Sequence, residues 1–94
     1  MIKYLKKNFN EEIQNGKVLV DFYADWCGPC RVMGEYLENV EGIDILKVNV
    51  DKFPDIAQQY GVMSIPTLII FENGNLLKSN VGLLDIDGLN EFIK

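Results

Sequence analysis

The segment from Lys17 to Ala24 constrains the fold most strongly, because it is apolar on both faces of a predicted strand except at Asp21. A strand with one exposed face alternates apolar and polar residues, whereas a strand covered on both sides is a nearly continuous apolar run. We therefore expect this segment to be the central strand of a sheet with helices on both faces. A chain of 94 residues has room for one such core, so residues 1–94 are expected to form a single domain.

Further elements alternate at short spacing along the chain. Asn8 and Glu11 resemble a capping box at the start of a short helix. Asn73-Gly74 tolerates the positive φ angles of a type I′ hairpin turn, and Asp85 is a suitable N-cap for the last helix. This order predicts an α/β fold with a mixed sheet. We expect helices near 8–15, 30–41, 54–60 and 85–93, and strands at 17–24, 45–50, 67–71 and 76–81.

The charge balance argues against two classes of partner. Fourteen acidic and nine basic side chains give a formal net charge of -5, so a nucleic-acid duplex or an anionic bilayer would repel the chain at long range. No segment approaches the roughly 18 consecutive apolar residues of a membrane span. The start of the chain is basic, but polar residues follow where a signal peptide has its apolar core. We expect a cytoplasmic protein with neither nucleic acid nor membrane as a partner.

The two cysteines are too few to hold the fold together, since disulfide-stapled scaffolds contain about 8–10% Cys. The chain has no His, and closed zinc sites usually use four Cys or His ligands, so no metal is expected. Both cysteines fall within Trp26-Cys27-Gly28-Pro29-Cys30. In a reducing cytosol, such a close pair is more often catalytic or metal-binding than structural.

The position of the cysteine pair indicates its chemistry. The pair follows a buried strand and opens an amphipathic helix, where free backbone N–H groups and the helix dipole favour a thiolate on Cys27. Cys30 lies nearly one turn later on the core face, so we expect Cys27 to be accessible and Cys30 to be shielded. Gly28 leaves room for an incoming disulfide, and Pro29 suits the first helical turn. Packing residues or an incidental disulfide are the alternatives, but a C-x-x-C between strand and helix indicates a redox-active pair.

Residues 20–31, Val-Asp-Phe-Tyr-Ala-Asp-Trp-Cys-Gly-Pro-Cys-Arg, closely resemble the active-site stretch of thioredoxins. The resemblance implies the thioredoxin fold, a central mixed sheet of four to five strands flanked by four helices. It also implies a protein disulfide reductase that has no bound cofactor and is itself reduced by a thioredoxin reductase. A monomer is expected. Further family motifs follow in order at 47–51, 60–62, 65–67, 73–74 and 81–82, so the likeness covers nearly the whole chain.

Asp21 lies in the apolar strand, where burial should raise the pKa of its carboxyl into a range useful for proton transfer. The resemblance implies that Asp21 lies behind the cysteines and takes the proton from Cys30 through water. It also implies that Lys47 neighbours Asp21, where an ammonium would moderate the rise. The alternatives are a solvated Asp21 at a strand edge and a solvated Lys47.

Ile65-Pro66-Thr67 resembles the cis-proline loop of the family, and the cis assignment rests on that resemblance because few X-Pro bonds are cis. Such a loop would offer the Ile65 backbone to an extended substrate segment beside the sulfurs. The alternatives are a core role for Trp26 and a turn role for Gly82. The resemblance implies a substrate-binding groove made of Trp26, Gly28, Pro29, Ile65, Pro66, Val81 and Gly82.

Two departures from the family pattern lie near the site. Glu35 stands where the helix usually has a kinking proline, which predicts a straighter helix, and Tyr23 stands where a tryptophan is common. Gly28-Pro29 resembles the reductants of the superfamily, whereas oxidants and isomerases typically have a His there. An oxidase or isomerase of the same fold is one alternative function. A non-enzymatic docking subunit that uses the surface around Trp26 is another.

Overall fold

The computed structural model describes residues 1–94. The chain forms five strands and four helices. None of the helices has both the length and the apolar character needed to cross a bilayer. The strands are β1 (Ile2–Tyr4), β2 (Lys17–Tyr23), β3 (Asp44–Asn49), β4 (Thr67–Glu72) and β5 (Asn75–Val81), and the helices are α1 (Phe9–Glu12), α2 (Gly28–Leu37), α3 (Pro54–Gln59) and α4 (Ile86–Phe92).

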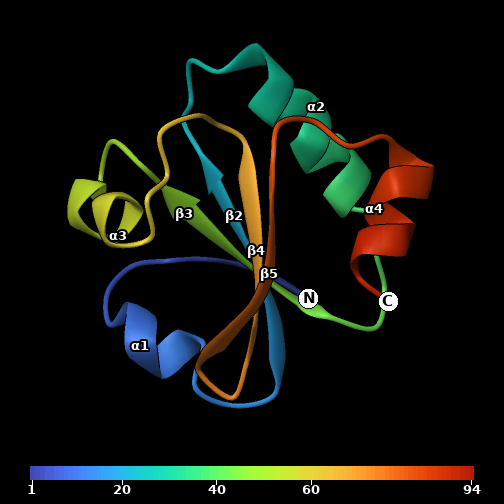
Figure 1. The fold of residues 1–94 in the computed structure, drawn as a ribbon. Coiled ribbons are helices and arrows are strands. Elements are labelled where there is room, and N and C mark those ends of the chain that lie inside the picture. Colours follow the sequence, from blue (N-terminus) through green and yellow to red (C-terminus); the bar gives the residue numbers. More distant parts are fainter.

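β2 lies at the centre of the sheet, as its apolar sequence predicted. The strand order is β1-β3-β2-β4-β5, and β2 pairs with β3 in parallel and with β4 antiparallel. β1 extends the parallel part beyond β3, while β5 is antiparallel to β4 at the opposite edge. Figure 1 shows this mixed sheet running between the helices. The fold class expected from the sequence is confirmed, with five strands.

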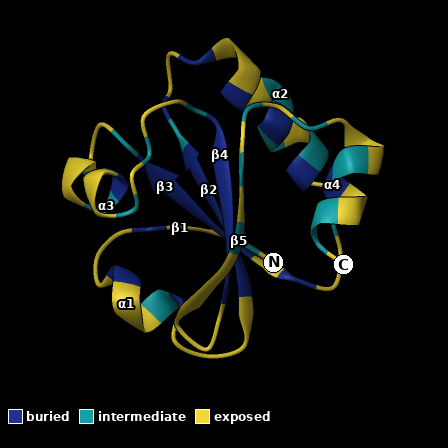
Figure 2. Cartoon of the chain, viewed as in Figure 1, coloured by how far each residue is buried: buried dark blue, intermediate teal, exposed yellow.

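Helices cover both faces of the sheet because β2 presents apolar side chains on both. On one face, Phe22 belongs to a buried cluster with Phe9 of α1 and Ala57 of α3. On the other face, Leu19 belongs to a buried cluster with residues of α2 and α4, among them Met33. Figure 2 shows the central strands buried and the outer surfaces of the helices exposed. Consecutive residues of β2 therefore point into different cores, which places every second residue under α2 and α4.

Two local signals read from the sequence are confirmed. Asn73 and Gly74 have φ angles of 51° and 85°, both positive as a type I′ turn between β4 and β5 requires. Oδ1 of Asp85 accepts a hydrogen bond of 2.7 Å from the N–H of Gly88, so Asp85 caps α4 as predicted.

The capping box predicted for the first helix is wrong. Asn8 has a left-handed backbone with φ of 58°, and its side chain makes no capping hydrogen bond. Its backbone carbonyl instead accepts hydrogen bonds from the N–H groups of Glu11 and Glu12. α1 is consequently a single turn that is held by burial of Phe9, whereas a full capping box would favour a longer helix.

Candidate active site

The cysteine pair lies where β2 gives way to α2. Because α2 begins at Gly28, Cys27 is its N-cap residue. Cys27 and Cys30 form a disulfide, with their Cα atoms 5.2 Å apart. The N–H of Cys30 donates to Sγ of Cys27 at 3.2 Å, and it is one of the backbone donors that have no partner within the helix. In the reduced chain, the same donor and the helix dipole would favour a thiolate on Cys27.

Both cysteines are buried, which corrects the expectation that Cys27 is accessible. Cys27 is 5% exposed and Cys30 is 2% exposed. Cys27 packs in a small cluster with Ala24 and Cys30, and its Sγ lies 3.9 Å from the carbonyl oxygen of Ile65. The loop before β4 therefore covers a sulfur that an open N-cap would leave free. Cys27 is the N-cap residue and Cys30 lies within α2.

A carboxylate and an ammonium lie buried together on the α2 side of the sheet. Asp21 is fully buried and Lys47 is buried, which excludes a solvated role for either. They face each other across the parallel pair of β2 and β3, and Nζ of Lys47 lies 3.1 Å from Oδ2 of Asp21. Burial raises the pKa of the Asp21 carboxyl above its ordinary value of 3.8, and the positive charge of Lys47 opposes part of that rise.

The Asp21 carboxylate has few hydrogen bonds for a buried group. The Lys47 ammonium, 3.1 Å from Oδ2, acts on it both as a positive charge and as a side-chain hydrogen-bond donor, and no other protein group donates to either oxygen. Hydrogen bonds to the charged form would hold a proton off the carboxylate. Lys47 is the one donor of this kind, and burial outweighs it, so Asp21 accepts a proton more readily than a solvated carboxylate.

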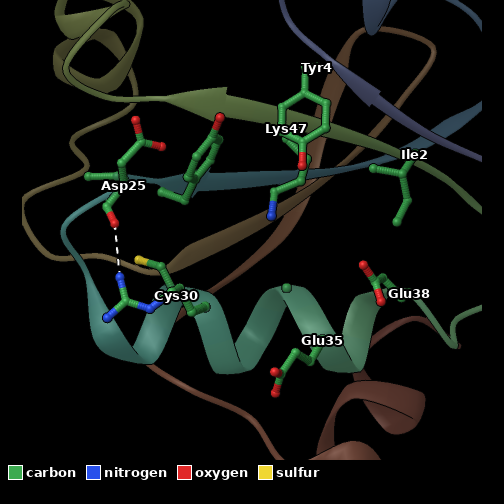
Figure 3. A pocket seen from close by; sticks show the side chains of 11 residues that line it. Ile2, Tyr4, Asp25, Cys30, Glu35, Glu38 and Lys47 are labelled. Carbon is green, nitrogen blue, oxygen red and sulfur yellow. Dashed lines mark hydrogen bonds between the residues drawn. The ribbon is translucent and has the colours of Figure 1, made fainter.

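A cavity of about 410 Å³ opens beside this ion pair. In Figure 3, Cys30 and the Lys47 ammonium point into the space above α2, and Glu35 and Glu38 lie along the helix. The cavity is lined by Cys30, Lys47, Tyr4 and both of these glutamates, so solvent can approach Cys30 from this side. No group of three or more His, Cys, Asp or Glu side chains in residues 1–94 is arranged to hold a metal ion.

Trp26 is exposed next to the disulfide, which excludes a core role for it. The residue is 69% exposed, and its indole Nε1 donates a hydrogen bond of 2.8 Å to Oδ2 of Asp51. This bond fixes an apolar ring on the surface without burying it. Asp51 lies two residues after the end of β3. Because the carboxyl ends of the parallel strands β2 and β3 meet at one edge of the sheet, Asp51 lies near the residues that follow β2.

The remaining groove residues come from the loop before β4 and the end of β5. The Ile65–Pro66 bond is cis, as the resemblance implied. The N–H of Gly82 donates to the carbonyl of Pro66 at 2.8 Å, which brings the two segments together. Gly82 has a φ of 99°, so it also has the turn role considered as an alternative. Val81 is exposed and lies opposite Thr67 in the β4–β5 pair.

At the start of α2, the other two predicted groove residues leave the surface open. A side chain at Gly28 would meet no atom within 4 Å, so the space in front of the disulfide is unobstructed. Pro29 lies in the first turn of the helix, where its missing N–H removes no hydrogen bond.

Sequence reasoning missed three residues around the site, namely Tyr4, Asp51 and Met63. Tyr4 lies near the Lys47 ammonium, and Asp51 anchors Trp26. Met63 is 96% exposed, two positions before Ile65. The position of Asp51 just after a predicted parallel strand could have indicated its place at the active edge of the sheet. The chain offers no comparable signal for Tyr4 or Met63.

Comparison with known proteins gives a consistent result. A family model described as thioredoxin matches residues 1–94. A thioredoxin from Chlamydia caviae is 47% identical over 98 residues, which cover 99% of this chain and 96% of the relative. A thioredoxin from Staphylococcus haemolyticus is 43% identical, over 99% of this chain and 94% of the relative. A solved structure of a mutant thioredoxin from Halobacterium salinarum NRC-1 matches with a TM-score of 0.89 and 35% identity, over 98% of this chain and 87% of that one.

Proposed function

The chain belongs to the thioredoxin family and is a thiol-disulfide oxidoreductase with a disulfide between Cys27 and Cys30, and from this premise we propose how its residues share the reduction of a protein disulfide. The observation that carries the proposal is the position of this disulfide at the N-terminus of α2. A dithiol in this position can pass two electrons to a substrate disulfide and close into a disulfide itself.

The reaction begins with Cys27. Its thiolate attacks one sulfur of the substrate disulfide, so that a mixed disulfide forms and the other substrate sulfur leaves as a thiolate. Cys30 then gives its proton through water to the Asp21 carboxylate, and the Cys30 thiolate attacks the Cys27 sulfur. The Cys27–Cys30 disulfide forms, the second substrate thiolate leaves, and both substrate thiolates take up protons from solvent. The substrate gains two electrons and the chain loses two.

Asp21 and Lys47 act together in the second step. The burial that raises the pKa of Asp21 makes its carboxylate a stronger base than a solvated one. Lys47, 3.1 Å away, keeps enough of the carboxylate ionised to accept a proton. The cavity beside them is lined by both Lys47 and Cys30, so water in it would reach Cys30 and the ammonium that contacts Asp21.

Substrate docks on the apolar groove around the sulfurs. The exposed ring of Trp26 and the Ile65 carbonyl, 3.9 Å from Sγ of Cys27, flank the point of attack. An extended segment of substrate pairs with the Ile65 backbone as an added strand. Gly28 and Pro29 keep the approach open, exposed Val81 and half-buried Gly82 form the far wall of the groove, and buried Pro66 supports that wall from below.

The partners follow from the same chemistry. The substrates are proteins with accessible disulfides, and a thioredoxin reductase returns electrons to Cys27 and Cys30. Residues 1–94 work as a single domain and a monomer in the cytoplasm, where they help to keep protein thiols reduced. The net charge of -5 keeps nucleic acid and anionic membranes from being partners.

The reduction potential tests the reductase function. We expect the Cys27–Cys30 couple to have a reduction potential of about -270 mV, the value of a thioredoxin, because Gly28-Pro29 resembles the dipeptide between the cysteines of the superfamily's reductants. The potential is measured by equilibrating the chain in dithiothreitol redox buffers and trapping free thiols by alkylation. A potential near about -180 mV or -120 mV, as in isomerases and oxidants, would contradict the proposal and favour the alternative redox functions.

Truncation of Trp26 tests the docking surface. Trp26→Ala should lower kcat/KM for insulin reduction by about 5- to 30-fold, because a central tryptophan contact contributes about 1–2 kcal/mol to an interface. The potential of the couple should stay the same. Leu77→Ala is the matched control, since Leu77 is also exposed but lies within β5, away from the disulfide. Equal effects of the two variants on kcat/KM would show that Trp26 has no specific part in substrate docking.

A further inference from the structure

The Lys47 ammonium has two aromatic neighbours in addition to its ion-pair partner Asp21. Its Nζ lies 3.1 Å from Oδ2 of Asp21, 4.7 Å from the centre of the Tyr23 ring and 5.9 Å from the centre of the Tyr4 ring. Both ring distances fall within the range of about 6 Å in which an aromatic ring attracts a cation. Figure 3 shows Tyr4 directly beside Lys47 at the wall of the cavity.

Strand register explains why these side chains meet. Lys47 lies opposite Tyr4 in the β1–β3 pair and opposite Asp21 in the β2–β3 pair. β3 lies between β1 and β2, so the lysine has a ring on one side and the carboxylate on the other. Tyr23 is two positions beyond Asp21 on β2 and therefore on the same face. The rings of Tyr4 and Tyr23 contact each other edge to face, with centres 6.2 Å apart.

Helix α2 closes the remaining side. A Cβ atom on Gly34 would lie 3.2 Å from Nζ of Lys47, so the bare backbone of the helix leaves just enough room for the ammonium. The group therefore occupies a slot between two aromatic rings, one carboxylate and one glycine.

Competing charges make this slot necessary. Glu35 of α2 and Glu38, which caps its C-terminus, line the same cavity as Lys47, as do Arg31 of α2 and Asp25 of the preceding loop. An ammonium on a flexible four-carbon chain could leave Asp21 for either glutamate or for water in the cavity. Tyr4 and Tyr23 line the same cavity, and the attraction of their rings for the ammonium opposes this movement.

We propose that Tyr4 is a positioning residue that, together with Tyr23, holds the Lys47 ammonium against Asp21 while Cys30 gives up its proton. The inference rests on the proposed role of Asp21 and adds a residue of β1 to it. Burial raises the pKa of the Tyr23 phenol above 10.0, so that ring stays neutral while Asp21 titrates. If the ammonium moves away, the Asp21 carboxylate loses its positive neighbour and binds its proton more tightly.

The experiment follows Asp21 directly. The midpoint of its titration is read from the chemical shift of its carboxyl carbon in the oxidised chain, for the wild type, Tyr4→Leu and Tyr4→Phe. Tyr4→Leu should raise the midpoint by about half a pH unit, since the free energy of an exposed cation–π contact corresponds to roughly 0.4 to 0.7 of a pKa unit. Tyr4→Phe keeps the ring and should leave the midpoint within about 0.2 units of the wild type. Tyr4 is exposed on an edge strand, so both variants should fold, and the spectra report this independently.

A Lys47→Met chain tests whether the effect of Tyr4 on the titration of Asp21 depends on Lys47. In a Lys47→Met chain there is no ammonium to hold, so adding Tyr4→Leu should not move the Asp21 midpoint. A shift of the same size in both backgrounds, or no shift in Tyr4→Leu alone, would overturn the positioning role of Tyr4.

The failure of the proposed function is distinguishable from the failure of the inference. In rapid-mixing measurements on a preformed mixed disulfide, the pH profile of its resolution should move upward by the same half unit in Tyr4→Leu. If the titration of the Asp21 carbon shifted but the pH profile of resolution did not, Tyr4 would position Lys47 as proposed, but Asp21 would not be the proton acceptor.

Discussion

Cys27→Ser should reduce insulin no faster than dithiothreitol does alone, a loss of at least about 10³-fold in the catalysed rate. A serine hydroxyl does not ionise at neutral pH and cannot attack a disulfide, whereas a thiol at the N-terminus of a helix is ready to ionise. The N–H of Cys30, which donates to Sγ of Cys27 at 3.2 Å, stabilises the thiolate and gives no comparable help to a hydroxyl. The measurement is the turbidity of reduced insulin against time.

Cys30→Ser is the matched control for this loss. It keeps the attacking thiol, so one turnover should proceed as far as a mixed disulfide on Cys27 and then stop. Gel electrophoresis without reductant would show the trapped species, and the same variant immobilised on a resin should retain substrate proteins from a cell extract. If Cys27→Ser were active, or if the adduct formed on Cys30, the assignment of the nucleophile would be wrong.

Binding without redox chemistry distinguishes the last alternative function. A chain with both Cys27→Ser and Cys30→Ser keeps the surface around Trp26 but cannot exchange disulfides. A docking subunit would keep its partner and its cellular effect in this double variant. A reductase should lose the effect, because both electrons it donates come from these two sulfurs.

Local sequence was sufficient for the parts of the fold in which neighbours along the chain decide the structure. The apolar run from Lys17 to Ala24 predicted the central strand, because a strand covered on both faces lacks polar alternation, and the observed strand ends one residue earlier, at Tyr23. Asn73-Gly74 predicted the turn of the hairpin, since few other residue pairs adopt two positive φ angles. The C-x-x-C after a strand placed Cys27 at the start of a helix, and the structure has it there.

Sequence was insufficient where distant segments decide the environment of a residue. The burial of Cys27 depends on the loop that contains Ile65, a residue 38 positions away in the sequence. The contact of Tyr4 with Lys47 depends on the register of an edge strand of only three residues, too short to have a period of its own. The sequence does not distinguish a capping box from a left-handed turn at Asn8, because both favour the same residue types.

Asp21→Asn should make the chain more stable above neutral pH, with a gain that depends on pH. The folded chain raises the pKa of Asp21 above 3.8, so the folded state binds this proton more tightly than the unfolded state does. Stability due to Asp21 is then fully present below pH 3.8 and is lost as the pH rises through the folded pKa. Each unit of the rise corresponds to about 1.4 kcal/mol. Asparagine has a similar shape and never ionises, so it avoids this loss.

The difference between two stability curves isolates the effect. Urea unfolding of wild type and Asp21→Asn between pH 4 and 9 should give free energies that nearly agree at the acidic end and diverge as Asp21 ionises. All other carboxyl groups are shared and cancel. Since Lys47 is the one group that contacts the carboxylate oxygens, the amide gives up only that charged contact. A variant less stable than wild type at pH 8 would mean that this pair outweighs burial.

Asp21→Asn, although it stabilises the fold, should slow the resolution of the mixed disulfide by Cys30. Without the carboxylate, Cys30 has no buried acceptor for its proton, so resolution of the mixed disulfide should be slower at pH 7 and should recover toward pH 9, where solvent deprotonates the thiol directly. Lys47→Met separates the two roles of the site, because it leaves the acceptor in place and removes its neutralising charge. That variant should lose stability as Asp21 ionises, in the direction opposite to Asp21→Asn. The ionised Asp21 carboxylate therefore destabilises the fold but accepts the proton of Cys30. If resolution of the mixed disulfide in Asp21→Asn kept the pH dependence of the wild type, Asp21 would not be the proton acceptor.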